Sequence, residues 1–132
     1  MSIFNTFPNY DTISAGTALS AGVFLNGNHP VRLVMPAGWN AAVMTLQESP
    51  DSNGGQPPLS ASYQSLYDQL GAEIALTVAA ARNIVIPTSL LPGAQWLRLR
   101  SGTTAAPVNQ TSTRTIILYV RKYGGLICPI SP

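Results

Sequence analysis

The segment QWLRLRSGT, which covers residues 95–103, sets apolar and basic side chains in alternation and then breaks into a loop. Successive side chains of a β-strand point to opposite faces of a sheet, so Leu97 and Leu99 are expected to face a core. The opposite face then carries Trp96, Arg98 and Arg100, an indole beside two guanidinium groups. Such a face can contact nucleic acid, a sugar or another protein, or it can simply face water. These three residues are therefore the first candidates for contact with a partner.

The same kind of pattern recurs along the chain. Segments with strand-like composition are separated by Gly, Pro, Asn and Asp, which favour turns. The segments cover residues 12–14, 19–25, 31–35, 42–47, 63–67, 74–78, 84–86, 95–100 and 115–122. Many short strands at close spacing predict an all-β fold with a single β-sandwich domain. In the last segment both faces carry apolar side chains, which is typical of a central strand.

Residues 63–70 fit two structures. Tyr63, Leu66, Tyr67 and Leu70 also match helical spacing, so a short helix remains an alternative to a strand here. The connection over residues 50–62 is the longest irregular stretch of the chain. Loops of this length in compact domains are often functional or mobile.

Both ends of the chain lie outside the strand pattern. We expect an N-terminal arm over residues 1–10, a β-sandwich domain over residues 11–123 and a C-terminal arm over residues 124–132. The arms carry the remaining candidate partner contacts, which are Phe4, Phe7, Tyr10, Leu126, Ile127 and Ile130. Apolar side chains on short terminal segments are unfavourable in water, so we expect at least one arm to contact an adjacent copy or another protein. The alternative is that both arms fold along their own sandwich.

The composition narrows the choice of partners. Only 9% of the residues are charged, against about 25% in an average soluble domain. The net charge of +2 rests on seven dispersed basic residues, which is a weak basis for binding nucleic acid. No apolar run approaches the roughly 20 residues that span a bilayer, so no membrane association is expected. The first residues also lack the basic and apolar regions of a secretory signal.

Residues that could carry chemistry are few. The carboxylates at positions 11, 48, 51, 68 and 73 are spread along the chain, and no Gly-x-Ser-x-Gly motif accompanies the single histidine, His29. Cys128 is the only cysteine, so no disulfide can form within the chain, and no metal-ligand spacing exists. We therefore expect that the protein is not an enzyme and that it has no catalytic residue, no cofactor and no metal site. We expect the indole of Trp39 to fill the core.

Three longer runs of sequence carry a further signal, because they occur in a fixed order. They are LVMPAGWNAAVMTLQESPD, LYDQLGAEIALTVAAARNIVIP and WLRLRSGTTAAPVNQTSTRTIILYVRK, which lie within residues 31–122. This ordered set resembles a recurring type of small protein encoded among the virion genes of tailed phages and prophages. The resemblance implies a jelly-roll-like sandwich and a structural role as a capsid decoration, or cement, protein. Neither arm nor the SNGGQPPLSAS loop is part of it.

A decoration protein would bind the major capsid protein on the outer surface of the virion, as a homo-oligomer made in the host cytoplasm. A weakly charged surface suits this role, because it is less costly to desolvate at an interface than a surface rich in salt bridges. A glycan-binding module of a head fibre or tail adhesion protein is the alternative, and it requires exposed aromatic residues around one cleft. Nucleic-acid binding would require a continuous basic surface.

Overall fold

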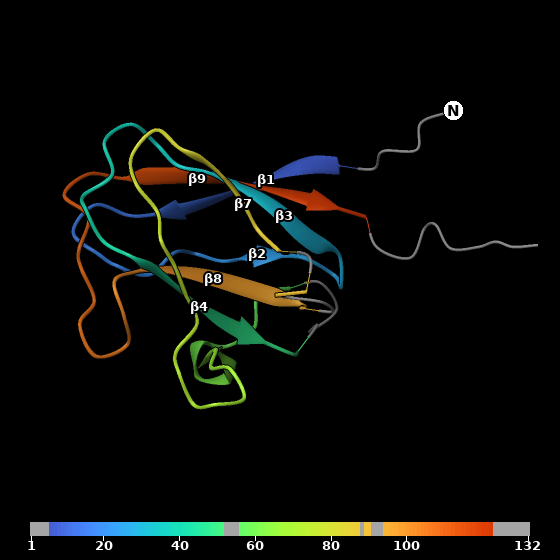
Figure 1. Cartoon of the computed structure of the whole chain (residues 1–132). Coiled ribbons are helices and arrows are strands. Elements are labelled where there is room, and N and C mark those ends of the chain that lie inside the picture. The colour runs from blue at the N-terminus through green and yellow to red at the C-terminus, as the bar shows by residue number, and fades with distance from the viewer. Residues whose placement is uncertain (1–5, 52–55, 88, 91–93, 123–132) are drawn as a thin grey trace, which may run out of the picture.

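The computed structural model describes residues 6–51, 56–87, 89–90 and 94–122, and two antiparallel β-sheets form its framework (Figure 1). Sheet A has the strand order β1-β9-β3-β7, and sheet B has the order β2-β8-β4-β5, with β6 also paired to β4. The strands are β1 (Thr6–Ile13), β2 (Val23–Phe24), β3 (His29–Val34), β4 (Met44–Ser49), β5 (Gln64–Ser65), β6 (Ala75–Leu76), β7 (Asn83–Val85), β8 (Trp96–Ser101) and β9 (Arg114–Arg121). A 3-10 turn, η2 (Ser60–Ser62), precedes β5. The predicted all-β sandwich is confirmed.

Strand pairing is nested along the chain. β1 pairs with β9, β2 with β8, β3 with β7 and β4 with β5, so the chain resembles one long hairpin whose two halves run side by side. Successive pairs belong alternately to sheet A and to sheet B. A hairpin folded across two sheets in this way is a jelly-roll arrangement. β9 is central in sheet A, as the apolar residues on both of its faces predicted.

Each of the predicted strand segments overlaps a strand of the described residues.

The expected N-terminal arm is wrong for Thr6 to Tyr10, because these residues pair with β9 as part of β1. Pro8 makes this strand hard to recognise in the sequence. The carbonyl of Thr12 accepts the N–H of Ala21 at 3.0 Å, so Thr12 points its backbone groups away from β9. Alternation along the strand turns Pro8 the same way. The N–H that proline lacks is therefore not needed in the ladder, which is the usual position of proline in an edge strand.

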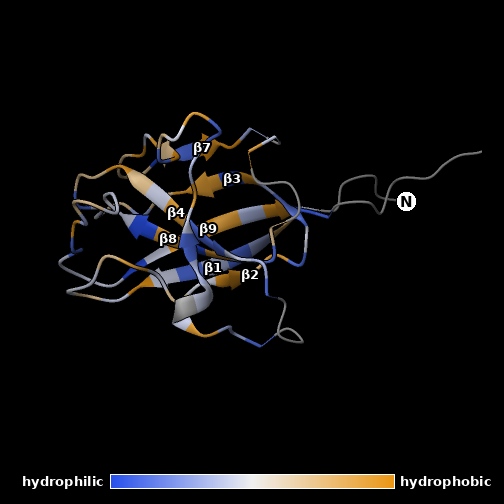
Figure 2. Ribbon diagram, turned by 90° about the horizontal axis from the view of Figure 1, so that it is seen from below, coloured by the Kyte–Doolittle hydropathy of each residue, from blue (hydrophilic) through white to orange (hydrophobic). Residues whose placement is uncertain are grey.

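The core lies between the two sheets. Its largest fully buried apolar side chains are Ile13, Leu25, Leu33, Met44, Leu46, Leu97, Leu99, Ile116, Leu118 and Val120. Figure 2 shows the corresponding hydrophobic stretches on β3, β4 and β9. Trp39 is buried in the same cluster, and its indole N–H donates to the carbonyl of Ala42 over 3.2 Å. The prediction that Trp39 fills the core is confirmed.

The segment that fitted both a helix and a strand forms a short strand followed by a tight turn. After β5, Tyr67 forms an isolated β-bridge with Glu73, and the turn lies between them. The Asp68 carboxylate fixes this turn, because its Oδ1 atom accepts two backbone N–H groups at 2.8 and 3.0 Å. Gly71 adopts a φ of +88°, which lies in the left-handed region and reverses the chain direction. The strand interpretation is therefore the correct one for the start of this segment.

Candidate functional site

The alternation in WLRLR produces the predicted orientation of side chains on β8. Leu97 and Leu99 point into the core and are fully buried. Trp96, Arg98 and Arg100 point to the outer face of sheet B, where their partners across β4 are Ser49, Gln47 and Thr45. A core-facing Arg98, which would have reversed the register of the strand, is not observed.

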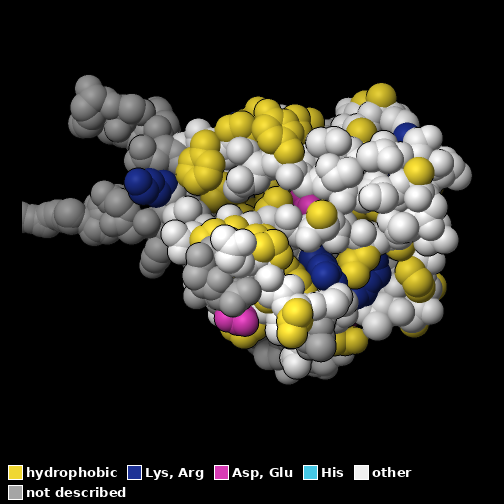
Figure 3. Space-filling model, turned by 180° about the vertical axis from the view of Figure 1, so that it is seen from behind, with side chains coloured by type: hydrophobic (Ala, Val, Ile, Leu, Met, Phe, Trp, Pro, Cys, Tyr) yellow, Lys and Arg dark blue, Asp and Glu magenta, His cyan; other side chains and the backbone are white. Residues whose placement is uncertain are grey.

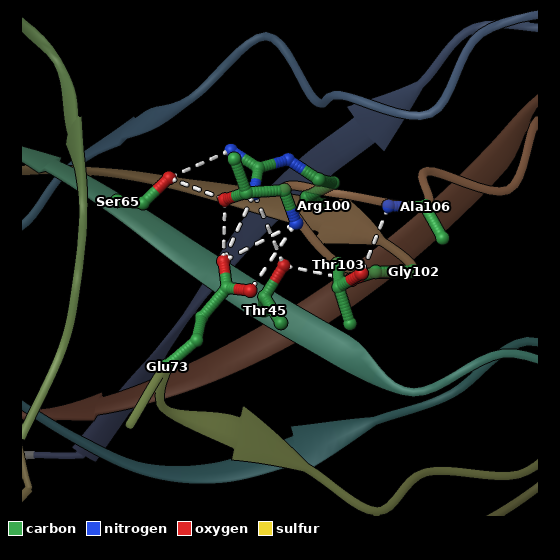
Figure 4. A network of polar contacts seen from close by, with 8 residues as sticks. Thr45, Ser65, Glu73, Arg100, Gly102, Thr103 and Ala106 are labelled. Atoms are coloured by element: carbon green, nitrogen blue, oxygen red, sulfur yellow. Dashed lines mark hydrogen bonds and ion pairs between the residues drawn. The ribbon is translucent and has the colours of Figure 1, made fainter. Parts of the chain in front are cut away.

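Arg100 is nevertheless enclosed by its own chain, with only 7% of its surface exposed. Its Nη1 atom donates to Glu73 Oε2 at 3.2 Å and to Thr104 Oγ1 at 2.6 Å, while Nη2 donates to Ser65 Oγ at 3.1 Å (Figure 4). Thr104 is held in turn by Glu73, which accepts both its hydroxyl and its backbone N–H. The guanidinium charge is therefore neutralised inside the subunit by the salt bridge to Glu73.

Arg98 and Trp96 are also held by neighbours in the same chain. The guanidinium of Arg98 lies 4.0 Å from the centre of the Tyr63 ring, and it donates to Ser60 Oγ at 3.0 Å. Burial raises the pKa of the Tyr63 phenol. Trp96 is 7% exposed and stacks on Phe24 with a centroid separation of 5.1 Å.

The proposed contact surface of Trp96, Arg98 and Arg100 is thus not open in the isolated subunit. Arg98 is partly exposed, but Trp96 and Arg100 are buried. The sequence pattern could assign these side chains to the outer face of a sheet, but it could not show that residues 60–73 fold across that face. Because Arg100 is already paired with Glu73, the face also lacks the continuous basic surface that nucleic-acid binding requires.

Asp11 is the most deeply buried side-chain carboxylate, and its hydrogen-bond partners belong to the framework of the sandwich. Burial raises the pKa of its carboxyl group. The carboxylate accepts the hydroxyl of Ser20 at 2.5 Å and the backbone N–H groups of Thr12 at 3.0 Å and Gly22 at 2.9 Å. Ser20 Oγ also accepts the N–H of Leu99, so this hydroxyl bonds on both sides and is poorly placed to act as a nucleophile.

The outer face of sheet A carries two adjacent rows of side chains that cross its strands. One row joins Tyr10, Ile117 and Val34. The next joins Pro8, Tyr119, Arg32 and Val85. We call the apolar members of both rows the sheet A face, which consists of Pro8, Tyr10, Val34, Val85, Ile117 and Tyr119. Tyr10 is 62% exposed and Val85 is 75% exposed, so much of this apolar surface is in contact with water.

Charge on the sheet A face is positive and sparse. The guanidinium of Arg32 lies 5.0 Å from the centre of the Tyr119 ring, and Arg121 is exposed at the end of β9. Asp11 points inward, and the other four carboxylates belong to β4 and to the segments that follow it up to Glu73.

Figure 3 shows hydrophobic side chains gathered near the top of the rear view, where β1 and β9 lie in Figure 1.

Sequence reasoning identified only part of this face. The sequence predicts partner contact for Tyr10 as part of an N-terminal arm, whereas the structure places it in β1. The apolar residues Ile117 and Tyr119 predict a central strand, which β9 is, but they do not predict that one of its faces is open to water. The available signal was the presence of apolar side chains on both faces of the last strand, in a small domain with only two layers.

The remaining candidates are distributed between strand and termini. Phe7 lies in β1 and is exposed at the surface. Phe4, Leu126, Ile127 and Ile130 lie outside the described residues. Within the described part of the chain, no group of three His, Cys, Asp or Glu residues is arranged to hold a metal ion. The same residues include no helix long and apolar enough to cross a bilayer.

Comparisons of the chain with protein-family models, with curated proteins and with solved structures found no match.

Proposed function

We propose that this chain is a non-enzymatic virion structural protein, a decoration protein that binds the outer surface of a tailed-phage capsid and stabilises the coat lattice. The observation that carries the proposal is the sheet A face, an exposed apolar surface that contains two tyrosines beside an arginine. Tyrosine and arginine are enriched at protein interfaces, where their large side chains supply most of the binding energy. This face is where the subunit would contact another protein of the particle.

Two properties of the chain support the same role. Its surface is poor in charge, which lowers the cost of desolvation when loops and sheet faces are buried against a shell. Its ordered motifs resemble those of small virion proteins, and they fall on the strands of a jelly roll. A capsid offers many equivalent sites, so weak individual contacts between linked subunits can still produce firm attachment.

A glycan-binding module is the alternative function, and the arrangement of the aromatic residues does not favour it. Tyr10 and Tyr67 are the most exposed aromatic side chains among the described residues. Tyr10 belongs to sheet A, whereas Tyr67 belongs to the turn that follows β5 of sheet B. They therefore do not frame one cleft, and the sheet A face has no carboxylate to accept hydrogen bonds from sugar hydroxyl groups.

Reconstitution of particles tests the proposal. Heads would be prepared from a phage or prophage that encodes the chain but carries a deletion of its gene, and purified subunit would be added back. We expect electron microscopy to show added density on the outer surface, and we expect decorated heads to rupture at a higher temperature. A double variant of the sheet A face, Tyr10→Ser with Val85→Ser, should remain folded and bind poorly, while Val43→Ser, an exposed change elsewhere, should bind normally. Folded wild-type subunit that does not bind heads would contradict the proposal.

A further inference from the structure

The turn between Tyr67 and Glu73 presents an apolar side chain in an unusual position. Leu70 stands at its tip with 88% of its surface exposed, and Tyr67 beside it is 53% exposed. We call residues 67–71 the hairpin tip. Leu70 and Tyr67 together place two large exposed side chains on one turn, and exposed apolar surface of this kind marks a candidate contact site.

The hairpin tip is rigid as well as apolar. Besides the two bonds to the Asp68 carboxylate, the backbone N–H of Asp68 donates to the carbonyl of Ala72 at 2.8 Å. The N–H of Gly71 donates back to the carbonyl of Asp68 at 3.1 Å. A turn fixed in this way loses little conformational entropy when its exposed side chains become buried, which favours its use as a binding element.

The hairpin tip and the sheet A face complement one another in chemistry. The tip offers Leu70 and Tyr67 next to the carboxylate of Asp68, whereas the face offers apolar side chains next to the guanidinium of Arg32. Opposite charges at the rim of an apolar contact fix its orientation and disfavour the contact of either surface with itself. In particular, two copies that met face to face would bring arginines together without a carboxylate from either face.

One copy of the chain cannot make this contact with itself. Figure 1 shows the yellow-green turn at the bottom of the view, below β4, whereas β1 and β9 lie near the top. The two surfaces belong to opposite sides of the sandwich, since the tip extends from sheet B and the face is the outer side of sheet A.

We propose that the hairpin tip of one copy packs on the sheet A face of a second copy, in a head-to-tail contact. The inference rests on the proposed role of the sheet A face as a protein-binding surface, and it names the partner as the chain itself. In a pair joined by this contact, the copy that supplies the tip retains an unused face, and the copy that supplies the face retains an unused tip. The contact therefore repeats, and it produces a closed ring when the rotation between copies closes.

Sedimentation of purified variants tests this contact. Wild-type protein should associate in a concentration-dependent manner, and Leu70→Ser should weaken association on the order of 10- to 100-fold, as expected from the loss of one buried leucine side chain. The face variant, Tyr10→Ser with Val85→Ser, should weaken association to a similar extent. Val43→Ser, a change of a 38% exposed apolar residue outside both surfaces, is the control, and it should associate as the wild type does.

Mixing the two defective variants gives the decisive measurement. Leu70→Ser protein keeps an intact face, and the face variant keeps an intact tip. At a concentration where neither variant associates alone, the mixture should therefore form one-to-one dimers. A contact of face against face would instead leave Leu70→Ser associating normally, and that result would overturn the inference. Wild-type protein that is monomeric up to about 1 mM, or variants that fail to complement one another, would overturn it as well.

These outcomes are separate from those of the proposed function. If the subunit is monomeric but still decorates heads, the proposed head-to-tail contact is contradicted and the decoration role is supported. Associating subunit that complements as described but never binds heads would support the contact between copies and contradict the role on the capsid.

Discussion

The Asp11 carboxylate accepts a hydrogen bond of 2.5 Å from the hydroxyl of Ser20, and this pair joins the two sheets of the sandwich. Asp11 belongs to β1 of sheet A, while the same Ser20 oxygen accepts the backbone N–H of Leu99, in β8 of sheet B, at 2.9 Å. Buried polar groups must be paired in this way, because an unpaired buried carboxylate or hydroxyl is strongly unfavourable.

Burial of Asp11 predicts a specific pH dependence of stability. Its pKa in the folded protein is raised above the ordinary value of 3.8, so the folded state binds more protons than the unfolded state between these two pKa values. The contribution of this group to the free energy of unfolding therefore falls as the pH rises from 3.8 through the folded pKa, and it is constant above that range.

Asp11→Asn removes this titration while keeping an oxygen that can accept the N–H groups of Thr12 and Gly22. Urea unfolding of both proteins between about pH 3 and pH 7 measures the effect. The wild type should gain stability relative to Asp11→Asn as the solution becomes more acidic. A difference between the two proteins that stays constant, or that increases with pH, would show that the carboxyl group does not titrate as expected.

The Arg100 network predicts a large effect on folding rather than on partner binding. Arg100→Ala removes a buried guanidinium and leaves the carboxylate of Glu73, whose side chain is 17% exposed, without its cation. Loss of these charged hydrogen bonds should cost about 1.5 to 3 kcal/mol. Arg32→Ala, on the outer face of sheet A, should change stability by less than about 1 kcal/mol. Chemical unfolding followed by circular dichroism compares the two, and similar stability of both variants would refute the structural role assigned to Arg100.

A double-mutant cycle measures the interaction energy between Arg100 and Glu73 apart from their contacts with other residues. Glu73→Gln and Arg100→Ala should each destabilise the protein, and the double variant should be less destabilised than the sum of the two, because it leaves no unpaired charge. Additive effects would mean that the two side chains contribute independently.

Trp39→Ala tests the core. The indole is buried in the central cluster, so its loss leaves a cavity and should cost about 3 to 5 kcal/mol, which is a large part of the stability of an average domain. Trp39→Phe should recover part of this loss, because the ring fills some of the space but cannot donate to the carbonyl of Ala42. Thermal unfolding measures both variants. A near-native melting temperature for Trp39→Ala would place the indole at the periphery.

The strands could be predicted from the sequence wherever apolar and polar residues alternate over several positions. β8 and β9 are the clearest cases, because burial of one face requires a strict period of two. β1 was only partly predicted, because Pro8 interrupts the pattern. A proline fits in a strand only where its missing N–H would face an unpaired edge of the sheet. That information resides in the pairing of strands and not in the local sequence.

The candidate site was harder to predict for a related reason. Glu73 and Arg100 are separated by 26 intervening residues, and nothing in the local pattern around either one indicates that they meet. The exposure of Ile117 and Tyr119 likewise depends on the number of layers in the fold, because the same residues would be core if a third layer covered sheet A. Alternation assigns a side chain to a face, whereas only the tertiary fold determines what lies against that face.

Gly102, which follows β8, provides the last prediction. Its φ of +91° lies in the left-handed region, and an added Cβ would lie 2.5 Å from the carbonyl oxygen of Ala106 and 2.7 Å from the backbone nitrogen of Val108. Both neighbours are backbone atoms, which cannot move aside without opening the bridge between Gly102 and Pro107.

Gly16 is the matched control for this position. Its φ is +80°, but no atom lies within 4 Å of an added Cβ. Gly16→Ala should therefore lower the free energy of unfolding by only about 1 to 2 kcal/mol, which is the penalty for alanine in the left-handed conformation. Gly102→Ala carries the same backbone penalty together with the steric clash, and it should cost at least about 2 kcal/mol more than the control. Urea unfolding of the two variants measures the difference. Equal destabilisation would mean that the backbone around Gly102 shifts freely, and that the close approach of residues 106–108 does not constrain the fold.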